Sequence, residues 1–430
     1  MNKVPILLFL ITLVPFSLSS SIVKLNINGP IDSITEEYII DNFEKLKIME
    51  DLSLIIIEID TPGGLDTSMR TIIKSIMNAP APVAVYVSPK GARAASAGFF
   101  ITIAADIASM APGTNMGAAS PVAITGQKIE ETMKKKITND AASYAKSLAK
   151  SKKRNLELSE KAVRESKSYT AEECFNNNLI EYIAEDIEDL IAQLEGKEIT
   201  MMDGEKITLK LRGKPITDIP MSGRQKFLKT ITNPNLAYFL LIFGLIGLYL
   251  EFTHPGIIIP GVLGGISLLL AFLAFQILPI NYVGLLLILL SIGFFIAEIK
   301  VQGFGVLGIG GVISFLLGSI ILINAPIPEM RPTMSIIITF SICFGLLILF
   351  LTFKVYKAMS QRTETGQEGL TGETGIAKSD IDSHSGKVFI HGEWWNAVSD
   401  EKIPAGSRVN ILSMKQFTLK VKGLYNQEKE

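Results

Sequence analysis

Histidine is scarce in this chain and absent from its first 253 residues. The 430 residues include three histidines, His254, His384 and His391. A Ser-His-Asp triad needs an imidazole to take the serine proton. Such a triad is therefore excluded from residues 1–253, and a serine nucleophile there would need another base.

Cysteine and charge are also in short supply. The two cysteines, Cys174 and Cys343, are too few for a disulfide framework or a cysteine-based metal site, and we predict neither metal nor cofactor. Charged residues make up 19% of the chain, whereas soluble proteins have about 25%. The deficit lies between residues 236 and 354, which indicates a membrane domain. A net charge of −1 gives no general attraction to nucleic acid.

Residues 1–19 have the features of a secretory signal peptide. Lys3 gives a short positive region, and residues 4–14 form an apolar stretch. Ser17 and Ser19 place small residues where a cut after Ser19 requires them. The alternative is an uncleaved anchor helix. Either way, we expect the domain that follows, residues 20–230, to be exported.

Five apolar runs follow this domain. They are roughly Leu236–Leu250, Ile257–Ile277, Tyr282–Ile299, Phe304–Ile323 and Ser335–Val355. A helix crosses a bilayer with about 20 residues, and the first run is short, so four and five crossings both fit. We predict five, in a membrane domain of residues 236–355. The C-terminus would then be cytoplasmic, in agreement with the positive charges of Lys354, Lys357 and Arg362.

Short β-branched runs alternate with amphipathic segments in the exported domain. The runs are Val23–Asn28, Leu54–Ile59 and Val83–Val87, and the segments between them are residues 33–49 and 67–77. This alternation predicts parallel βαβ units in an α/β fold. The turns after the second and third runs mark strand ends, where ligands bind in such sheets.

Ser96 is a candidate nucleophile. It lies in a stretch of small residues from Gly91 to Gly98, just before an apolar segment. Small neighbours let a substrate backbone come close, and a helix N-terminus offers free N–H groups to a developing oxyanion. The alternative is a helix cap with no catalytic role.

Lysine is the strongest remaining candidate for the base. Three consecutive lysines, Lys134, Lys135 and Lys136, open an amphipathic helix. Its expected apolar face comprises Met133, Ile137, Ala141, Tyr144 and Leu148. At about 100° per residue, Lys134 lies nearer the middle of this face than Lys136, and Lys135 points away. An ion pair between Lys136 and Asp140 would oppose deprotonation of that lysine, so the choice between Lys134 and Lys136 stays open.

Four motifs, in this order, resemble those of the membrane-bound ClpP-class serine proteases of the long-form NfeD family. They are Asp60-Thr61-Pro62-Gly63-Gly64, Ala95-Ser96-Ala97-Gly98, the stretch from Ala111 to Ala119, and Lys136-Ile137-Thr138-Asn139-Asp140. The order of signal peptide, protease domain, membrane spans and small β domain also matches, so the resemblance covers essentially the whole chain.

The resemblance implies a ClpP/crotonase-like α/β fold and a Ser-Lys dyad. The catalytic serine maps onto Ser96, and the lysine maps onto Lys136 rather than Lys134. Backbone N–H groups of Gly63 or Gly64 would form the oxyanion hole with that of Ala97. One departure is Ser120, where many relatives have histidine, and it bears on substrate contacts rather than on the dyad.

Residues 366–424 carry short strand signals separated by turns. Four are readable, at Gly375–Ala377, Lys387–His391, Arg408–Leu412 and Phe417–Val421. They predict a small all-β barrel, and the resemblance implies an OB fold. Some OB folds bind nucleic acid through a basic, aromatic face. Trp394 and Trp395 are aromatic candidates, but the segment is not markedly basic, so we expect protein contact and no nucleic-acid binding.

The sequence thus predicts a membrane-anchored serine endopeptidase with an exported active site. The resemblance implies peptide substrates with hydrophobic residues, a stomatin-like membrane protein as partner, and a homo-oligomer, a dimer or larger. One alternative is a catalytically inactive scaffold that organises stomatin-like proteins. Another is a crotonase-like acyl-CoA enzyme, against which export argues because CoA esters are cytoplasmic.

Overall fold

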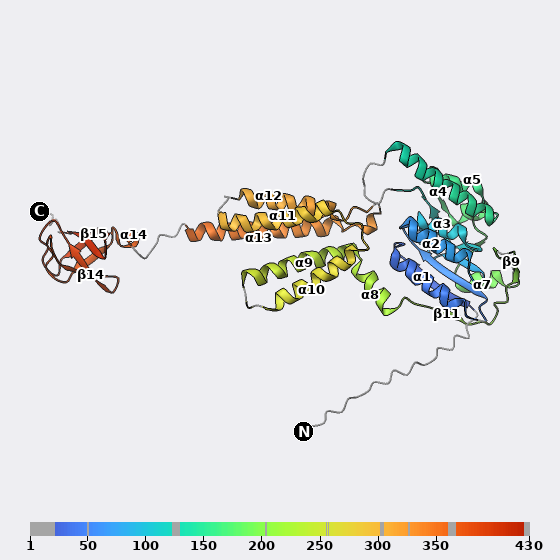
Figure 1. Ribbon diagram of the computed structural model, residues 1–430, viewed down its shortest axis with the longest axis horizontal. Coiled ribbons are helices and arrows are strands. Elements are labelled where there is room, and N and C mark those ends of the chain that lie inside the picture. Colours follow the sequence, from blue (N-terminus) through green and yellow to red (C-terminus); the bar gives the residue numbers. More distant parts are fainter. Residues whose placement is uncertain are drawn as a thin grey trace, which may run out of the picture. The chain divides into compact units, whose positions relative to one another are not determined.

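A parallel sheet forms the centre of the N-terminal region in the computed structural model (Figure 1). The structure describes residues 22–49, 51–122, 130–202, 204–254, 256, 258–301, 305–325, 327–359 and 367–424. In spatial order the strands are β11 (Ile216–Asp218), β1 (Ile22–Asn28), β2 (Leu54–Asp60), β3 (Val83–Val87), β5 (Ile107–Met110) and β8 (Tyr182–Ile183). All neighbouring strands are parallel. The predicted signal peptide lies outside the described residues.

Apolar side chains are buried on both faces of this sheet. Parallel strands need crossover connections, and these cover both faces. On one face, alternate residues of β2 such as Ile55 and Ile57 pack with α1 (Ser33–Leu46), α2 (Asp66–Met77) and α3 (Ala97–Ala104). On the other, Leu54 and Ile56 pack with α7 (Ile187–Leu194). The predicted βαβ architecture is therefore confirmed.

A second, smaller sheet continues from the first through an isolated bridge between Thr61 and Ala94. It has the order β4 (Arg93–Ala95), β6 (Asn115–Gly117) and β7 (Ser168–Thr170). The remaining elements of the region are α4 (Glu131–Ser151), α5 (Leu156–Arg164), α6 (Ala171–Asn176), the pair β9 (Glu198–Thr200) and β10 (Lys206–Thr208), and α8 (Gly223–Ile231). The bridge places β4, which leads directly to Ser96, beside the turn that follows β2.

Five apolar helices occupy the predicted membrane region. They are α9 (Pro234–Thr253), α10 (Ile258–Phe275), α11 (Tyr282–Val301), α12 (Val306–Leu322) and α13 (Met334–Met359). Three stretches within the described residues, Pro234–Phe252, Ile258–Phe275 and Pro328–Leu347, are long and apolar enough to cross a membrane. Two shorter apolar helices, Tyr282–Glu298 and Val306–Leu322, accompany them. The number of crossings stays a prediction.

Glycines let α9 and α10 approach closely. A Cβ atom at Gly247 would lie 2.5 Å from the Pro260 carbonyl oxygen and 2.8 Å from the Gly264 Cα. Small residues give helices in lipid the close backbone packing that holds them together, because lipid supplies no hydrophobic driving force between them. Close backbone contact at these glycines therefore holds α9 and α10 together.

The C-terminal region is a closed five-stranded barrel that follows α14 (Gln367–Leu370). Its order is β12 (Thr374–Ala377), β13 (Lys387–Ile390), β14 (Glu393–Val398), β16 (Thr418–Gly423) and β15 (Arg408–Lys415). The predicted OB-like barrel is confirmed, and β14 is the strand that the sequence did not reveal. As expected for neighbours in a strand, Trp395 packs against the barrel core, whereas Trp394 is 62% exposed.

Candidate active site

Ser96 stands at a sharp turn between β4 and α3. Its backbone has φ 51° and ψ −113°, a region that residues other than glycine rarely adopt. The Ser96 N–H donates to the Gly117 carbonyl over 2.9 Å, and the Ser96 carbonyl accepts from the Phe99 N–H. The side chain makes no capping bond to α3. The helix-cap alternative thus has no hydrogen bond to support it, and the strained turn presents the hydroxyl beside the helix N-terminus.

The loop after β2 passes directly beside Ser96. Gly63 has φ +105°, and a Cβ atom there would lie 2.5 Å from the Ser96 Cβ and 3.1 Å from its Oγ. At Gly64, a Cβ atom would lie 2.0 Å from the Ile31 carbonyl oxygen. Two hydrogen bonds, Ile31 N–H to the Gly63 carbonyl and Leu65 N–H to the Ile31 carbonyl, hold the loop in place. Glycine is therefore required at both positions.

The three predicted oxyanion donors differ in their hydrogen bonding. The Gly63 N–H donates to Thr61 Oγ1 over 3.0 Å, and Thr61 is fully buried, so this donor is occupied. Within the described part of the chain, the N–H groups of Gly64 and Ala97 have no hydrogen-bond partner. Gly64 and Ala97 are thus the pair able to receive a developing oxyanion.

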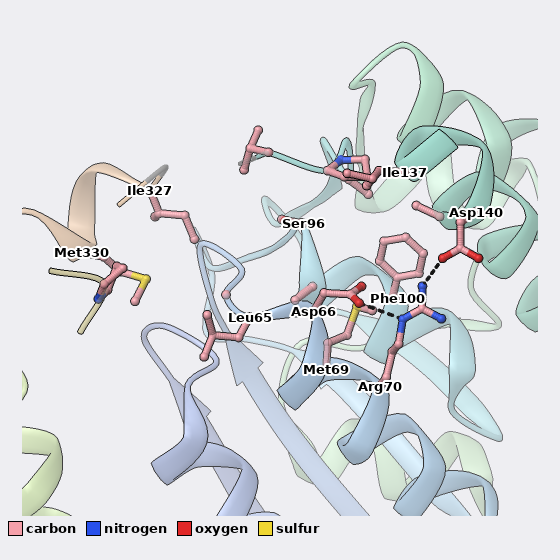
Figure 2. Close-up of a pocket in the computed structure, with 17 residues that line it drawn as sticks. Leu65, Asp66, Met69, Arg70, Ser96, Phe100, Ile137, Asp140, Ile327 and Met330 are labelled. Carbon is pink, nitrogen blue, oxygen red and sulfur yellow. Dashed lines mark hydrogen bonds and ion pairs between the residues drawn. The ribbon is translucent and has the colours of Figure 1, made fainter. Parts of the chain in front are cut away.

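A cavity of about 200 Å³ opens in front of Ser96 (Figure 2). Most of its lining is apolar: Gly64, Leu65, Met69, Ala97, Phe100, Ala119, Pro121, Val122, Ile137, Ala141, Pro279, Ile327 and Met330. Its polar lining residues are Ser96, Asp66, Arg70 and Asp140. A pocket of this kind suits an apolar side chain beside a reactive hydroxyl.

Arg70 joins the two helices that flank the cavity. Its Nε lies 2.9 Å from Asp66 Oδ2 on the same helix, and its Nη2 lies 2.5 Å from Asp140 Oδ2 on α4. The guanidinium also stacks 4.5 Å above the centre of the Tyr144 ring, which stacks in turn on Phe100. Asp140 is thus paired with Arg70 rather than with Lys136.

The three lysines of α4 lie on its exposed first turns. Lys134, Lys135 and Lys136 are all exposed, and none is among the described residues that line the cavity. The Ser96 hydroxyl has no hydrogen-bond partner within the described ranges. The structure therefore does not bring Ser96 into contact with Lys136, and this pair stays a prediction.

The expected apolar face of α4 is buried only in part. Met133 is 52% exposed, whereas Ala141 and Leu148 are buried in the core. Helix α4 therefore packs into the core from Ala141 in its third turn onward, and its first two turns are largely exposed. Ser120, the position that departs from the family pattern, hydrogen-bonds Ser166 over 2.6 Å.

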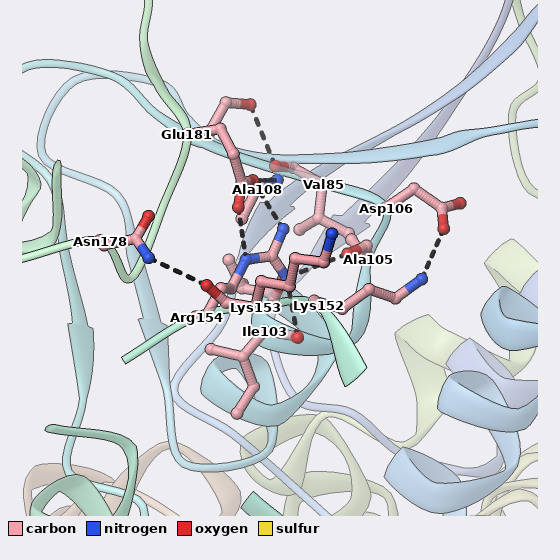
Figure 3. Close-up of polar contacts among 12 residues, drawn as sticks. Val85, Ile103, Ala105, Asp106, Ala108, Lys152, Lys153, Arg154, Asn178 and Glu181 are labelled. Carbon is pink, nitrogen blue, oxygen red and sulfur yellow. Dashed lines mark hydrogen bonds and ion pairs between the residues drawn. The ribbon is translucent and has the colours of Figure 1, made fainter. Parts of the chain in front are cut away.

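Arg154 anchors the far end of the helix that begins at Ser96 (Figure 3). It is 3% exposed, and its Nη1 donates to the carbonyls of Ile103 (2.8 Å) and Ala105 (3.0 Å) at the C-terminus of α3. Its Nε and Nη2 contact the two carboxylate oxygens of Glu181 at 2.8 and 2.6 Å. A cation there satisfies carbonyls that lack helical partners and complements the helix dipole.

Sequence reasoning did not single out Thr61, Arg70 or Arg154. Thr61 lay inside the motif that held the glycines, and the spacing of Asp66 and Arg70 is that of a helical ion pair. Arg154 follows a run of lysines and has no local signal, because its carbonyl partners lie some fifty residues before it and Glu181 lies 27 residues after it.

All three regions of the chain match models of known protein families. Family models described as "NfeD1b, N-terminal domain", "NfeD integral membrane domain" and "NfeD-like C-terminal, partner-binding domain" match residues 22–203, 235–354 and 367–422. The membrane-bound protease PH1510 of Pyrococcus horikoshii is 33% identical over 405 residues, 91% of each chain. The membrane protein NfeD1b of Bacillus subtilis is 27% identical over 376 residues, 80% of each chain.

Solved structures of a similar protease domain also match. One is the 1510-N membrane-bound stomatin-specific protease, a lysine-to-alanine mutant in complex with a substrate peptide, at 30% identity, covering 50% of this chain and 99% of that one, with a TM-score of 0.46. Another is the 1510-N membrane protease specific for a stomatin homolog from Pyrococcus horikoshii, at 31% identity, covering 49% and 98%, with a TM-score of 0.43.

Proposed function

This chain belongs to the NfeD family of membrane proteins, and on that premise we propose that it is a membrane-anchored serine endopeptidase with Ser96 as its nucleophile. The observation that carries the proposal is the setting of Ser96. A half-buried serine on a strained turn faces an apolar cavity, beside two free backbone N–H groups. Acyl transfer needs these parts: a nucleophile, a place for the substrate and donors for the oxyanion.

Lys136 is the proposed base. No histidine lies within residues 1–253, so a neutral amine is the strongest remaining candidate. Arg70 holds Asp140, the carboxylate that would otherwise keep Lys136 charged from one turn away. Lys136 directly precedes Ile137, which lines the cavity, so a turn of its long side chain would bring the amine toward Ser96.

The proposed reaction has two steps. Neutral Lys136 takes the proton of the Ser96 hydroxyl as Oγ attacks the peptide carbonyl, and the N–H groups of Gly64 and Ala97 hold the oxyanion. The protonated lysine then gives its proton to the leaving amine, and an acyl-enzyme forms. Water hydrolyses the ester with the lysine again as base, which restores Ser96.

The apolar lining supports a substrate with hydrophobic residues. The relative of known structure is named a stomatin-specific protease, and we propose a stomatin-like membrane protein as the substrate or partner here. The C-terminal barrel, which matches the partner-binding domain of the family, is the proposed contact for such a partner. Export of the protease domain, a cytoplasmic barrel and a homo-oligomer belong to the same proposal.

Hydrolysis by the full-length chain in detergent or nanodiscs tests the assignment. We expect Ser96→Ala to abolish cleavage of an apolar fluorogenic peptide and labelling by a serine-directed phosphonate. Ser151→Ala, an exposed serine at the end of α4, is the matched control and should retain both. Cleavage that persists in Ser96→Ala would refute Ser96 as the nucleophile.

The inactive scaffold remains the second candidate, and the exposure of Lys136 outside the cavity is the observation that favours it. A scaffold would hold its partners without turnover. It predicts a wild-type chain that binds a stomatin-like protein but is not labelled at Ser96 at mildly alkaline pH.

A further inference from the structure

Three side chains of the cavity wall come from connections between the apolar helices. Pro279 lies between α10 and α11, whereas Ile327 and Met330 lie between α12 and α13, around the short 3₁₀ helix η1 (Pro328–Met330). Met330 is 6% exposed, so it is packed rather than loosely placed. Figure 2 shows Ile327 and Met330 approaching from the side opposite Ile137 and Asp140. The cavity is therefore closed by residues outside the predicted protease domain.

An ion pair fastens this wall to the strand that leads to Ser96. Arg93 on β4, three residues before Ser96, donates from Nη2 to Glu329 Oε1 over 2.5 Å. The backbone N–H of Arg93 also donates to Asp60 Oδ1 over 3.1 Å, so the arginine is held at its base as well. The ion pair of Arg93 and Glu329 thus connects the segment that carries Ile327 and Met330 to the strand that leads to Ser96.

The second connection is braced internally. The Met330 N–H donates to the Ile327 carbonyl over 3.0 Å, and the Arg331 side chain donates to the Ala325 carbonyl. A bridge between Ile280 and Ile323 ties the two connections to each other. The wall is therefore a defined structure and not two independent loops.

Membrane topology gives an independent reason for this placement. If the N-terminal domain is exported and α9 crosses inward, every second connection returns to the exported side. The connections after α10 and after α12 are these, and they supply Pro279, Ile327 and Met330. Five crossings thus put all parts of the cavity in one compartment.

We infer that these two connections form a specificity wall, defined as Pro279, Ile327 and Met330, which selects an apolar substrate side chain next to the scissile bond. The inference rests on the proposed function and deepens it. A peptide segment that leaves the bilayer would reach Ser96 between this wall and the α2–α4 side of the cavity. Its apolar side chain would be removed from water against the wall, whereas a polar one would lose its hydration without a partner.

Two peptides that differ at one position, leucine or glutamine, test the wall in the full-length chain. We expect the wild type to prefer the leucine peptide and Ile327→Asn to reduce that preference about tenfold, mainly through KM. Labelling by a small phosphonate then shows whether the variant keeps an intact nucleophile, because the wall does not touch the reacting atoms. Ile48→Asn is the matched control, since Ile48 is an 85% exposed isoleucine of the N-terminal domain and lies outside the cavity.

A charge swap keeps the test decisive if Ile327→Asn fails to fold. Arg93→Glu and Glu329→Arg should each lower the preference about two- to fivefold, and the double variant should restore it. An unchanged preference in Ile327→Asn with normal labelling, or no rescue by the double variant, would overturn the inference. A wild type that is never labelled at Ser96 would instead overturn the proposed function and the wall with it.

Discussion

The Cα atom of Gly63 lies so close to Ser96 that a Cβ atom at position 63 would sit 2.5 Å from the Ser96 Cβ. Real Cβ atoms essentially never approach this closely, so the loop or the serine must move. We expect Gly63→Ala to lower kcat/KM about 100-fold or more, because small displacements at a reacting centre are costly. Gly91→Ala is the control: Gly91 also has positive φ (+87°), but its Cβ would meet nothing within 4 Å. Equal activity of the two variants would refute the steric argument.

Arg154→Met should destabilise the N-terminal domain and weaken labelling of Ser96. The change leaves Glu181 without its buried partner and the last carbonyls of α3 without a donor, at a cost of about 3 kcal/mol. Chemical denaturation of the full chain gives the stability, and the labelling rate reports on Ser96. Lys161→Met, which breaks an exposed helical pair with Glu157, should leave stability essentially unchanged, because solvent screens such pairs. Similar losses in both variants would contradict an anchoring role.

Arg70→Ala should move the pH profile of hydrolysis. The change frees Asp140, which lies one turn after Lys136, to pair with that lysine and favour its charged form. The rising limb of kcat/KM against pH should then shift to higher pH, since more alkaline conditions are needed for neutral lysine. The double variant Arg70→Ala/Asp140→Asn removes the free carboxylate and should shift the limb back. A limb that does not move in Arg70→Ala would argue against Lys136 as the base.

The buried hydroxyl of Tyr38 should make the free energy of unfolding fall at alkaline pH. Burial raises its pKa to about 12, and its hydroxyl donates to the Ile219 carbonyl over 2.6 Å. The folded chain thus holds this proton more tightly than the unfolded chain, whose tyrosines titrate near pH 10. The contribution is complete below about pH 10 and is lost as pH rises toward 12. Tyr38→Phe should therefore be less stable at pH 8, but should show a shallower decline in unfolding free energy between pH 10 and 12.

Gly247→Ala should disrupt the packing of α9 on α10. The added Cβ would lie 2.5 Å from the Pro260 carbonyl oxygen, and two backbones cannot yield easily. We expect a loss of about 1–3 kcal/mol, measured as thermal stability of the detergent-solubilised chain. Gly265→Ala on the partner helix α10 is the control, since its Cβ would meet nothing within 4 Å. We expect Gly247→Ala to be less stable than Gly265→Ala. Equal thermal stabilities of the two variants would contradict close packing at Gly247.

Periodicity and β-branching located the longer elements of the fold. The runs predicted as strands at residues 23–28, 54–59 and 83–87 are β1, β2 and β3, and the helix predicted at 67–77 is α2. The short strands β5 and β8, with four and two residues, escaped because so few residues show no alternation. In the barrel, β14 was missed because Trp394 and Trp395 are adjacent and break the alternation.

The candidate site was predictable where its parts are close in sequence. Ser96 stood out by its small neighbours, the family resemblance pointed to the glycine pair, and the structure brings them together. Ile327 and Met330 could not be found, since they lie more than 230 residues after Ser96 and belong to a different set of helices. Helical periodicity also assumed a fully packed α4, whereas its first two turns are largely exposed, so burial does not decide between Lys134 and Lys136.

The specificity wall has a geometric consequence for where a substrate is cut. Pro279, Ile327 and Met330 are tied by short connections to helices of the membrane domain, so the height of Ser96 above the bilayer is set by the protein. In a substrate anchored in the same bilayer, only a bond at a matching distance from the membrane surface would then reach Ser96. The cleaved bond would be chosen by its number of residues from the membrane surface as well as by the side chain that enters the cavity.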